Sequence, residues 1–176
     1  NCPVIVYLDS TASGNLTIPI GANAVLGSTL TVQSAHASNT LTLDMGGKTL
    51  SATAITVSTR GVLTNSGAAA ACTCSGAFTV SGASSVVSGA IVLTYGTYVQ
   101  SDGTATQVGN WSGGDVTASG GTLTAAGSAS VTTTSSGDVN LTGATVTADK
   151  LNLVMTGAGK TLTTTATLFG LKASAA

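Results

Sequence analysis

Residues 41–50 contain the pattern that decides the fold and read Leu41-Thr42-Leu43-Asp44-Met45-Gly46-Gly47-Lys48-Thr49-Leu50. Leu41 and Leu43 alternate with polar residues, which is the period of a strand that buries one face. The two glycines that follow favour a turn with positive φ. Residues 151–162 read Leu-Asn-Leu-Val-Met-Thr-Gly-Ala-Gly-Lys-Thr-Leu and repeat the same order. We therefore expect a strand, a glycine-rich turn and a second strand at both places.

Short alternating segments of this kind recur along the chain, and no sustained helical stripe of apolar residues is found. They begin at Leu16, Leu30, Leu41, Ile55, Phe78, Ile91, Val116, Val131, Val139 and Leu151. Strands this short favour a solenoid, in which each rung contributes two or three strands and stacks on the next. The sequence predicts an all-β fold, a parallel β-helix (β-solenoid) of about seven short-stranded rungs, as a single domain over residues 1–176.

The separations between segments predict which of them stack. We expect Leu16 to lie beside Leu41, and Ile55 to lie between Leu30 and Phe78. Residues 96–110 lack the alternation and are expected to form one long rung or a protruding loop. The few aromatic residues form no stripe along the sequence.

The composition excludes several classes of protein. Charged residues make up 6% of the chain, whereas ordinary soluble domains carry roughly 25%. With a net charge of −1, the chain has no electrostatic footprint for nucleic acid. An apolar fraction of 43% argues against disorder. No apolar run reaches the about 20 residues of a membrane-spanning helix, so no membrane span is expected.

Residues 113–162 resemble the repeats of filamentous-haemagglutinin and autotransporter-passenger proteins. The resemblance rests on Gly-Gly-Asp-Val-Thr-Ala, Gly-Gly-Thr-Leu-Thr-Ala-Ala-Gly and Ser-Gly-Asp-Val-Asn-Leu-Thr-Gly-Ala-Thr-Val-Thr-Ala. It implies a secreted, right-handed parallel β-helix. The sequence departs from that family in its length of 176 residues and in its three cysteines. Its composition also resembles structural sheath and filament proteins of prokaryotic cell surfaces.

The three cysteines are the most informative single residues. Cys72 and Cys74 are two apart and would share one face of a strand. In a secreted chain, an odd number of cysteines suggests an intermolecular bond or a free thiol. Cys2 would lie about three rungs from the other two at ~4.8 Å per rung, too far for a disulfide within one subunit. We expect inter-subunit disulfides from Cys2, Cys72 and Cys74; the alternative is that all three are small buried apolar residues.

Three Asn-X-Ser/Thr sequences, at Asn15, Asn110 and Asn140, are candidate glycosylation sites. Asn140 is expected to point outward from a strand, as attachment of a glycan requires. Covalent sugars would help to hydrate a surface that carries few charges.

Residues suited to catalysis are scarce, and we expect no enzyme activity, no cofactor and no metal. His36 is the only histidine and lies in a predicted loop. The aspartates mostly occur in turn sequences such as Ser101-Asp102-Gly103. Both Gly-Lys-Thr triplets lack the upstream glycine of a phosphate-binding loop, because those positions are Thr42 and Val154. A β-helical enzyme that cleaves polysaccharides remains the weakest alternative.

Threonine pairs such as Thr122-Leu123-Thr124 are also found in ice-binding solenoids. Ice binding requires that the threonine pairs recur once in every rung, on the same face of the solenoid. Their irregular spacing here favours ordinary β-propensity as the explanation.

The predicted fold leads to a hypothesis about function. Neither end of the solenoid shows a charged or helical cap, so edge-to-edge association is expected. We expect a structural subunit of an extracellular polymer, such as a filament, sheath or surface layer, whose partner is the chain itself. An adhesin module that binds cells or glycans is the alternative, and ice binding is the third candidate. Because the sequence begins at Asn1, we expect a removed secretory signal and a location at the cell surface.

Overall fold

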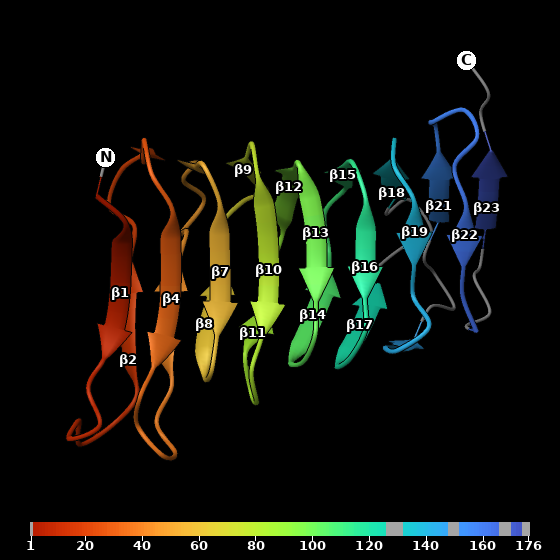
Figure 1. Ribbon diagram of the computed structural model, residues 1–176. Helices are drawn as coiled ribbons and strands as arrows, with labels where there is room; N and C mark the ends of the chain where they lie inside the picture. The colour runs from red at the N-terminus through yellow and green to blue at the C-terminus, as the bar shows by residue number, and fades with distance from the viewer. Residues whose placement is uncertain (1, 126–131, 148–151, 166–169, 174–176) are drawn as a thin grey trace.

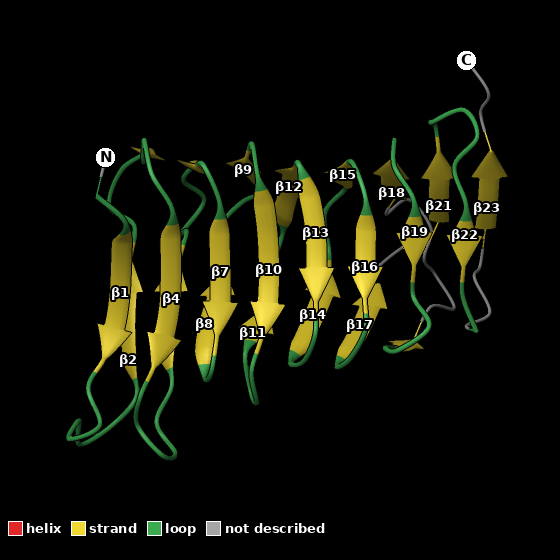
Figure 2. Cartoon of the chain, viewed as in Figure 1, coloured by secondary structure: helices red, strands yellow, loops and turns green. Residues whose placement is uncertain are grey.

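Short strands of two to five residues follow one another along the chain and form three parallel sheets (Figure 1). The computed structural model describes residues 2–125, 132–147, 152–165 and 170–173. Within these ranges every regular element is a strand and none is a helix (Figure 2). The prediction of an all-β fold is therefore confirmed.

The strands are distributed over the sheets in strict rotation. The first sheet contains, in spatial order, β1 (Val4–Leu8), β4 (Leu30–Ser34), β7 (Ile55–Ser58), β10 (Ala77–Ser81), β13 (Thr97–Gln100), β16 (Val116–Ala118), β19 (Val139–Asn140) and β22 (Leu162–Thr163). The second contains β2 (Leu16–Pro19), β5 (Leu41–Asp44), β8 (Gly61–Thr64), β11 (Val86–Val87), β14 (Thr104–Gln107), β17 (Thr122–Ala125) and β20 (Thr145–Thr147). The third contains β3 (Ala24–Val25), β6 (Leu50–Ala52), β9 (Ala70–Cys74), β12 (Ile91–Tyr95), β15 (Trp111–Gly113), β18 (Thr132–Ser135), β21 (Asn152–Met155) and β23 (Gly170–Ala173).

Because the chain returns to the same sheet at every third strand, it winds as a β-solenoid of about seven rungs. The register confirms the expected stacking. Leu16 pairs with Leu41, and Ile55 pairs with Leu30 on one side and Phe78 on the other. Two further expected segments begin at Val131 and Leu151, which lie outside the described residues.

Both Gly-Lys-Thr triplets lie in turns between strands, as expected. The first joins β5 to β6, and Gly46 and Gly47 have φ values of 55° and 80°. The second joins β21 to β22, and Gly159 has a φ of 69°. Positive φ is a conformation that glycine adopts without steric cost. The glycines therefore allow the chain to turn sharply at these corners.

The core is the interior of the solenoid, where inward residues of successive rungs stack in register. One row of the first sheet is buried throughout and consists of Leu30, Ile55, Phe78, Tyr98, Val116 and Val139. Alternate residues of the same strands point outward and are mostly threonine, as at Thr31 and Thr56. Burial of each large apolar side chain contributes roughly 1.5–3 kcal/mol. The period-two pattern thus supplies the main stabilisation of the fold.

Residues 96–110 form neither a long rung nor a protruding loop, and that expectation was wrong. They contain β13 and β14, which pair in parallel with strands on both sides. The alternation is hidden in the sequence because the amides of Gln100 and Gln107 occupy inward, fully buried positions. Gln100 Oε1 accepts a hydrogen bond from Tyr98 Oη at 2.9 Å, and Gln107 Nε2 donates to the carbonyl of Thr132 at 3.1 Å. These bonds offset the cost of burying the amides.

Four aromatic side chains meet inside the solenoid, although they form no stripe in the sequence. Phe78 and Tyr98 are stacked, with ring centroids 6.1 Å apart and planes 9° apart. The ring of Tyr98 also lies 5.8 Å from that of Tyr95 and 5.3 Å from that of Trp111. The four residues come from β10, β12, β13 and β15. Rung stacking brings them together across unequal separations in the sequence.

Candidate functional site

The two ends of the solenoid are the surfaces best suited to self-assembly. At one end, β1, β2 and β3 are the last strands of their sheets, and at the other end these are β22, β20 and β23. Each of these strands pairs on one side only within the described chain. Figure 1 shows the first rung and the β22–β23 region at opposite ends of the stack. An edge strand presents a row of N–H and C=O groups to which another strand can pair.

Exposed apolar side chains are concentrated on the first rung. Of the six large apolar residues that are exposed in the described part of the chain, four lie on β1, β2 and β3. They are Ile5, Tyr7, Leu16 and Val25, of which Val25 is 81% exposed. The other two, Val92 and Val108, lie in the middle of the chain. The first rung is therefore both an open edge and an apolar surface.

Cys72 and Cys74 share the inward face of β9, as their spacing predicts, and both side chains are at most 1% exposed. Burial raises the pKa of Cys72 to about 12, with a smaller contribution from Cys74, and raises that of Cys74 to about 11. A thiol enclosed in the core cannot reach a neighbouring subunit. Cys72 and Cys74 therefore pack as small apolar side chains, which is the alternative considered from the sequence. Cys2 is exposed. Inter-subunit disulfides stay a prediction, and exposure favours Cys2 as the residue that forms them.

The three candidate glycosylation sites are all exposed, and Asn140 lies in β19 with its side chain outward, as expected. Asn15 Oδ1 accepts a hydrogen bond from the backbone N–H of Thr40 at 2.8 Å, and Asn110 Oδ1 accepts one from Thr132 at 3.0 Å. These contacts link one rung to the next. A glycan is attached to the amide nitrogen, so the Oδ1 contacts leave room for it. Glycosylation at these sites stays a prediction.

The residues considered for catalysis serve the turns. His36 lies in the loop after β4, where its Nδ1 accepts hydrogen bonds from the backbone N–H groups of Ser38 at 3.0 Å and Asn39 at 2.9 Å. Asp102 likewise accepts a hydrogen bond from the adjacent Gly103. In the ranges that the structure covers, no three His, Cys, Asp or Glu side chains are grouped closely enough to hold a metal ion.

Three aspartates of the described residues, Asp44, Asp115 and Asp138, accept hydrogen bonds from the next rung of the solenoid. Asp44 accepts hydrogen bonds from the hydroxyl and the backbone N–H of Ser66, and these bonds lower the pKa of its carboxyl group. Asp138 accepts one from the backbone N–H of Thr161, which is the main cause of its lowered pKa. Lys160 lies 3.8 Å from the same carboxylate. These carboxylates have a structural role that the turn sequences predicted only in general terms.

Among the described residues there is no helix that is long and apolar enough to cross a membrane.

Comparisons of the chain with protein-family models, with curated proteins and with solved structures find no match. The resemblance implied a parallel β-helix, and the chain is a parallel β-solenoid.

Proposed function

We propose that the chain is a structural subunit of an extracellular polymer that grows by stacking of solenoids end to end. The observation that carries this proposal is the first rung, where three open strand edges coincide with the largest group of exposed apolar side chains. Unpaired edges without charges are sites of association with further strands. The chain carries few charges to oppose such contact.

The direction of the strands favours head-to-tail stacking. Neighbouring strands are parallel in all three sheets. A second copy can therefore place its β1 and β3 beside β22 and β23 and continue the first and third sheets in the same direction. The inward row of the first sheet would also continue, because it starts at Val4 and reaches Leu162. Such a contact joins two different surfaces and does not close, so it produces a filament.

Cys2 gives this polymer a second type of contact. It is exposed and lies just before β1, at the first-rung end of each subunit. In a head-to-tail stack this end meets the opposite end of the next copy, so two Cys2 residues do not meet along one filament. We therefore assign Cys2 to disulfides between copies in neighbouring filaments. The resemblance of residues 113–162 to filamentous-haemagglutinin repeats supports a secreted, cell-surface location.

Electron microscopy of the concentrated protein tests the proposal, combined with boiling in SDS with and without reductant. We expect long filaments or sheets, with lateral bundles that separate when reductant is added. A monodisperse monomer of 16.8 kDa at high concentration would contradict a polymer. If such a monomer bound cells or glycans, the adhesin hypothesis would replace it.

A specific observation favours ice binding as the second candidate. The outer face of β14, β17 and β20 carries two rows of threonines in register, which are Thr104, Thr122 and Thr145, and Thr106, Thr124 and Thr147. These threonines are unevenly separated in the sequence, which by itself favours ordinary β-propensity over ice binding. Rungs lie ~4.8 Å apart and residues two apart on a strand ~6.6 Å apart, so the rows form a regular array.

Hydroxyl and methyl groups at such spacings can order a layer of water. Thermal hysteresis of the purified protein tests this second candidate. We expect Thr124→Lys to abolish any hysteresis, because Thr124 is central in its row. Thr117→Lys is the matched control, since Thr117 lies outward on β16 in the first sheet. Equal hysteresis in both variants, or none in the wild type, would rule out the threonine array.

A further inference from the structure

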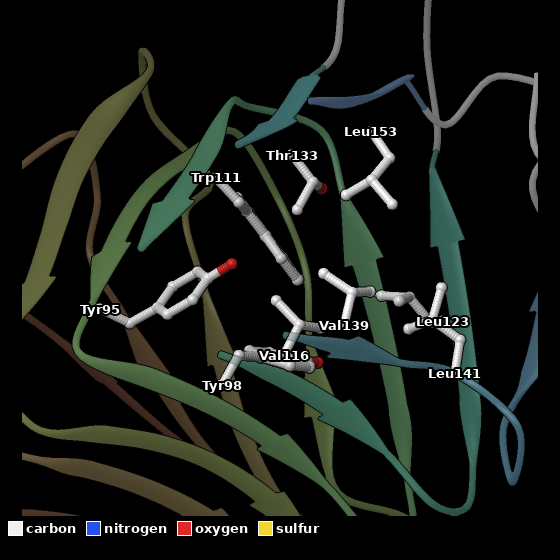
Figure 3. Close-up of a pocket in the computed structure, with 9 residues that line it drawn as sticks. All are labelled: Tyr95, Tyr98, Trp111, Val116, Leu123, Thr133, Val139, Leu141 and Leu153. Carbon is white, nitrogen blue, oxygen red and sulfur yellow. The ribbon is translucent and has the colours of Figure 1, made fainter. Parts of the chain in front are cut away.

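A small cavity lies inside the solenoid, beside the aromatic cluster (Figure 3). Its volume is about 10 Å³, which is close to the least space that a single water molecule needs. Most of its lining is aliphatic, from residues such as Val116, Val139 and Leu153. Tyr95, Trp111 and Thr133 supply the polar atoms that matter for the argument.

Two buried polar atoms at this cavity meet no hydrogen-bonding group of the described chain. They are Oη of Tyr95 and Nε1 of Trp111. The side chains are 4% and 3% exposed, so bulk water does not reach them. Figure 3 shows the hydroxyl end of Tyr95 directed toward the ring of Trp111. The hydroxyl of the neighbouring Tyr98 does have a partner, because its Oη donates to Gln100 Oε1 at 2.9 Å.

Neither ring is free to turn away in search of a protein partner. Tyr95 lies against the backbone of Gly113, and a Cβ at that position would overlap Cδ2 of the tyrosine ring. Trp111 packs on Tyr98, with centroids 5.3 Å apart. The packing of the two rings therefore keeps Tyr95 Oη and Trp111 Nε1 at the cavity.

Thr133 adds an acceptor on the next rung. It pairs directly with Trp111 in the third sheet, and its Oγ1 donates a hydrogen bond to Gln107 Oε1 at 3.0 Å. A hydroxyl oxygen that donates one bond still has lone pairs to accept another. The cavity is therefore lined by one fixed donor, one hydroxyl that can donate or accept, and one acceptor.

We propose that this cavity binds one water molecule, which bridges Trp111 Nε1 and Tyr95 Oη. The indole N–H donates to the water, and the water in turn donates to Thr133 Oγ1 or Tyr95 Oη. Buried waters in proteins usually make about three hydrogen bonds to groups that would otherwise be unpaired. Larger ligands are excluded by the volume, so water is the one ligand that matches both the space and the polar atoms.

The first experiment uses the single tryptophan of the chain, which gives one indole N–H signal in NMR spectra. We expect a cross-peak between that N–H and a water molecule bound for longer than the tumbling time of the protein. A spectrum of the wild type in which the indole N–H shows no such cross-peak would overturn the proposal.

The second experiment measures the midpoint temperature of unfolding for Tyr95→Phe. If water bridges the two atoms, the variant loses a hydrogen bond and its midpoint falls. If the cavity is dry, the variant loses an unpaired buried hydroxyl and its midpoint rises or stays equal, which would overturn the proposal. Tyr7→Phe is the control, because Tyr7 is 48% exposed and its hydroxyl reaches solvent.

Discussion

The ring of Tyr95 lies directly against Gly113 of the neighbouring rung, where any side chain would overlap it. The two residues occupy paired positions, with Tyr95 in β12 and Gly113 in β15. Both face the interior, so the ring fills the space that a side chain at position 113 would otherwise take. The absence of a Cβ at this position is a packing requirement of the aromatic cluster.

Replacement of this glycine is the first prediction. Gly113→Ala should lower the free energy of unfolding by about 1–3 kcal/mol, because the added methyl group meets both the ring and the backbone of Tyr95. Chemical denaturation measures the change. Gly21→Ala is the control, since a Cβ at Gly21 meets no atom within 4 Å and should leave stability almost unchanged. Equal stability of the two variants would contradict the packing described.

The aromatic stack should also carry a large share of core stability. Phe78→Ala removes a fully buried ring that stacks on Tyr98. Deletions of this kind cost about 3–5 kcal/mol, because the cavity that they leave collapses only in part. Val92→Ala, at a residue 40% exposed, should cost much less. The comparison is made by denaturation of both variants under the same conditions.

Thiol reactivity distinguishes the three cysteines. At pH 8 we expect a thiol reagent to modify one cysteine of the folded monomer rapidly, and all three after unfolding. The reason is that burial raises the pKa of Cys72 to about 12 and that of Cys74 to about 11, so thiolate is scarce and enclosed. Cys2→Ser should abolish the rapid reaction. Rapid modification of that variant while folded would show that β9 does not bury its thiols.

Stability should fall in acid because of Asp44. Its carboxyl pKa is lowered from an ordinary value of 3.8 by the bonds from Ser66. A group with a lowered pKa in the folded state contributes stability above its unfolded pKa and loses it as pH falls through the folded value. Asp44→Asn should therefore be less stable than the wild type at pH 7, and the difference should shrink as the pH falls below 3.8, the ordinary pKa of the group. Circular dichroism at a series of pH values checks both statements; a difference independent of pH would contradict them.

Assembly should depend on the first rung. Val25 is the most exposed large apolar residue in the described chain and lies in the edge strand β3. Val25→Lys places a charge at that edge, which opposes strand addition, and should shift the protein from polymer to monomer in sedimentation velocity. Val92→Lys, on the central strand β12 of the same sheet, should still assemble. Polymers of equal length from both variants would exclude this end as the contact.

Local features of the fold could be predicted from the sequence. The alternation at Leu41 and Leu43, and the glycines that follow, specify a buried face and a turn without reference to distant residues. The pairing of Leu16 with Leu41 followed from segment spacing, because one winding of the chain returns to the same sheet. The exposure of Asn140 followed from the same alternation.

Features that depend on several rungs at once could not be predicted. The inward amides of Gln100 and Gln107 look like interruptions in the sequence, since their Nε2 groups donate to carbonyls of other strands, those of Thr122 and Thr132. The burial of Cys72 and Cys74 depends on which face of β9 meets the interior. The threonine rows of β14, β17 and β20 are aligned although their spacing in the sequence is uneven.

Neighbouring residues are enough to specify that the chain alternates every two residues and turns at glycines. Which residues stack on one another depends on the tertiary structure. Rungs differ in their number of residues, and these differences lie in the loops. The hydrogen bonds of the three parallel sheets keep the strands in register. That register brings Tyr95, Trp111 and Gly113 together around the cavity, and it places the exposed apolar residues of β1, β2 and β3 at one open end.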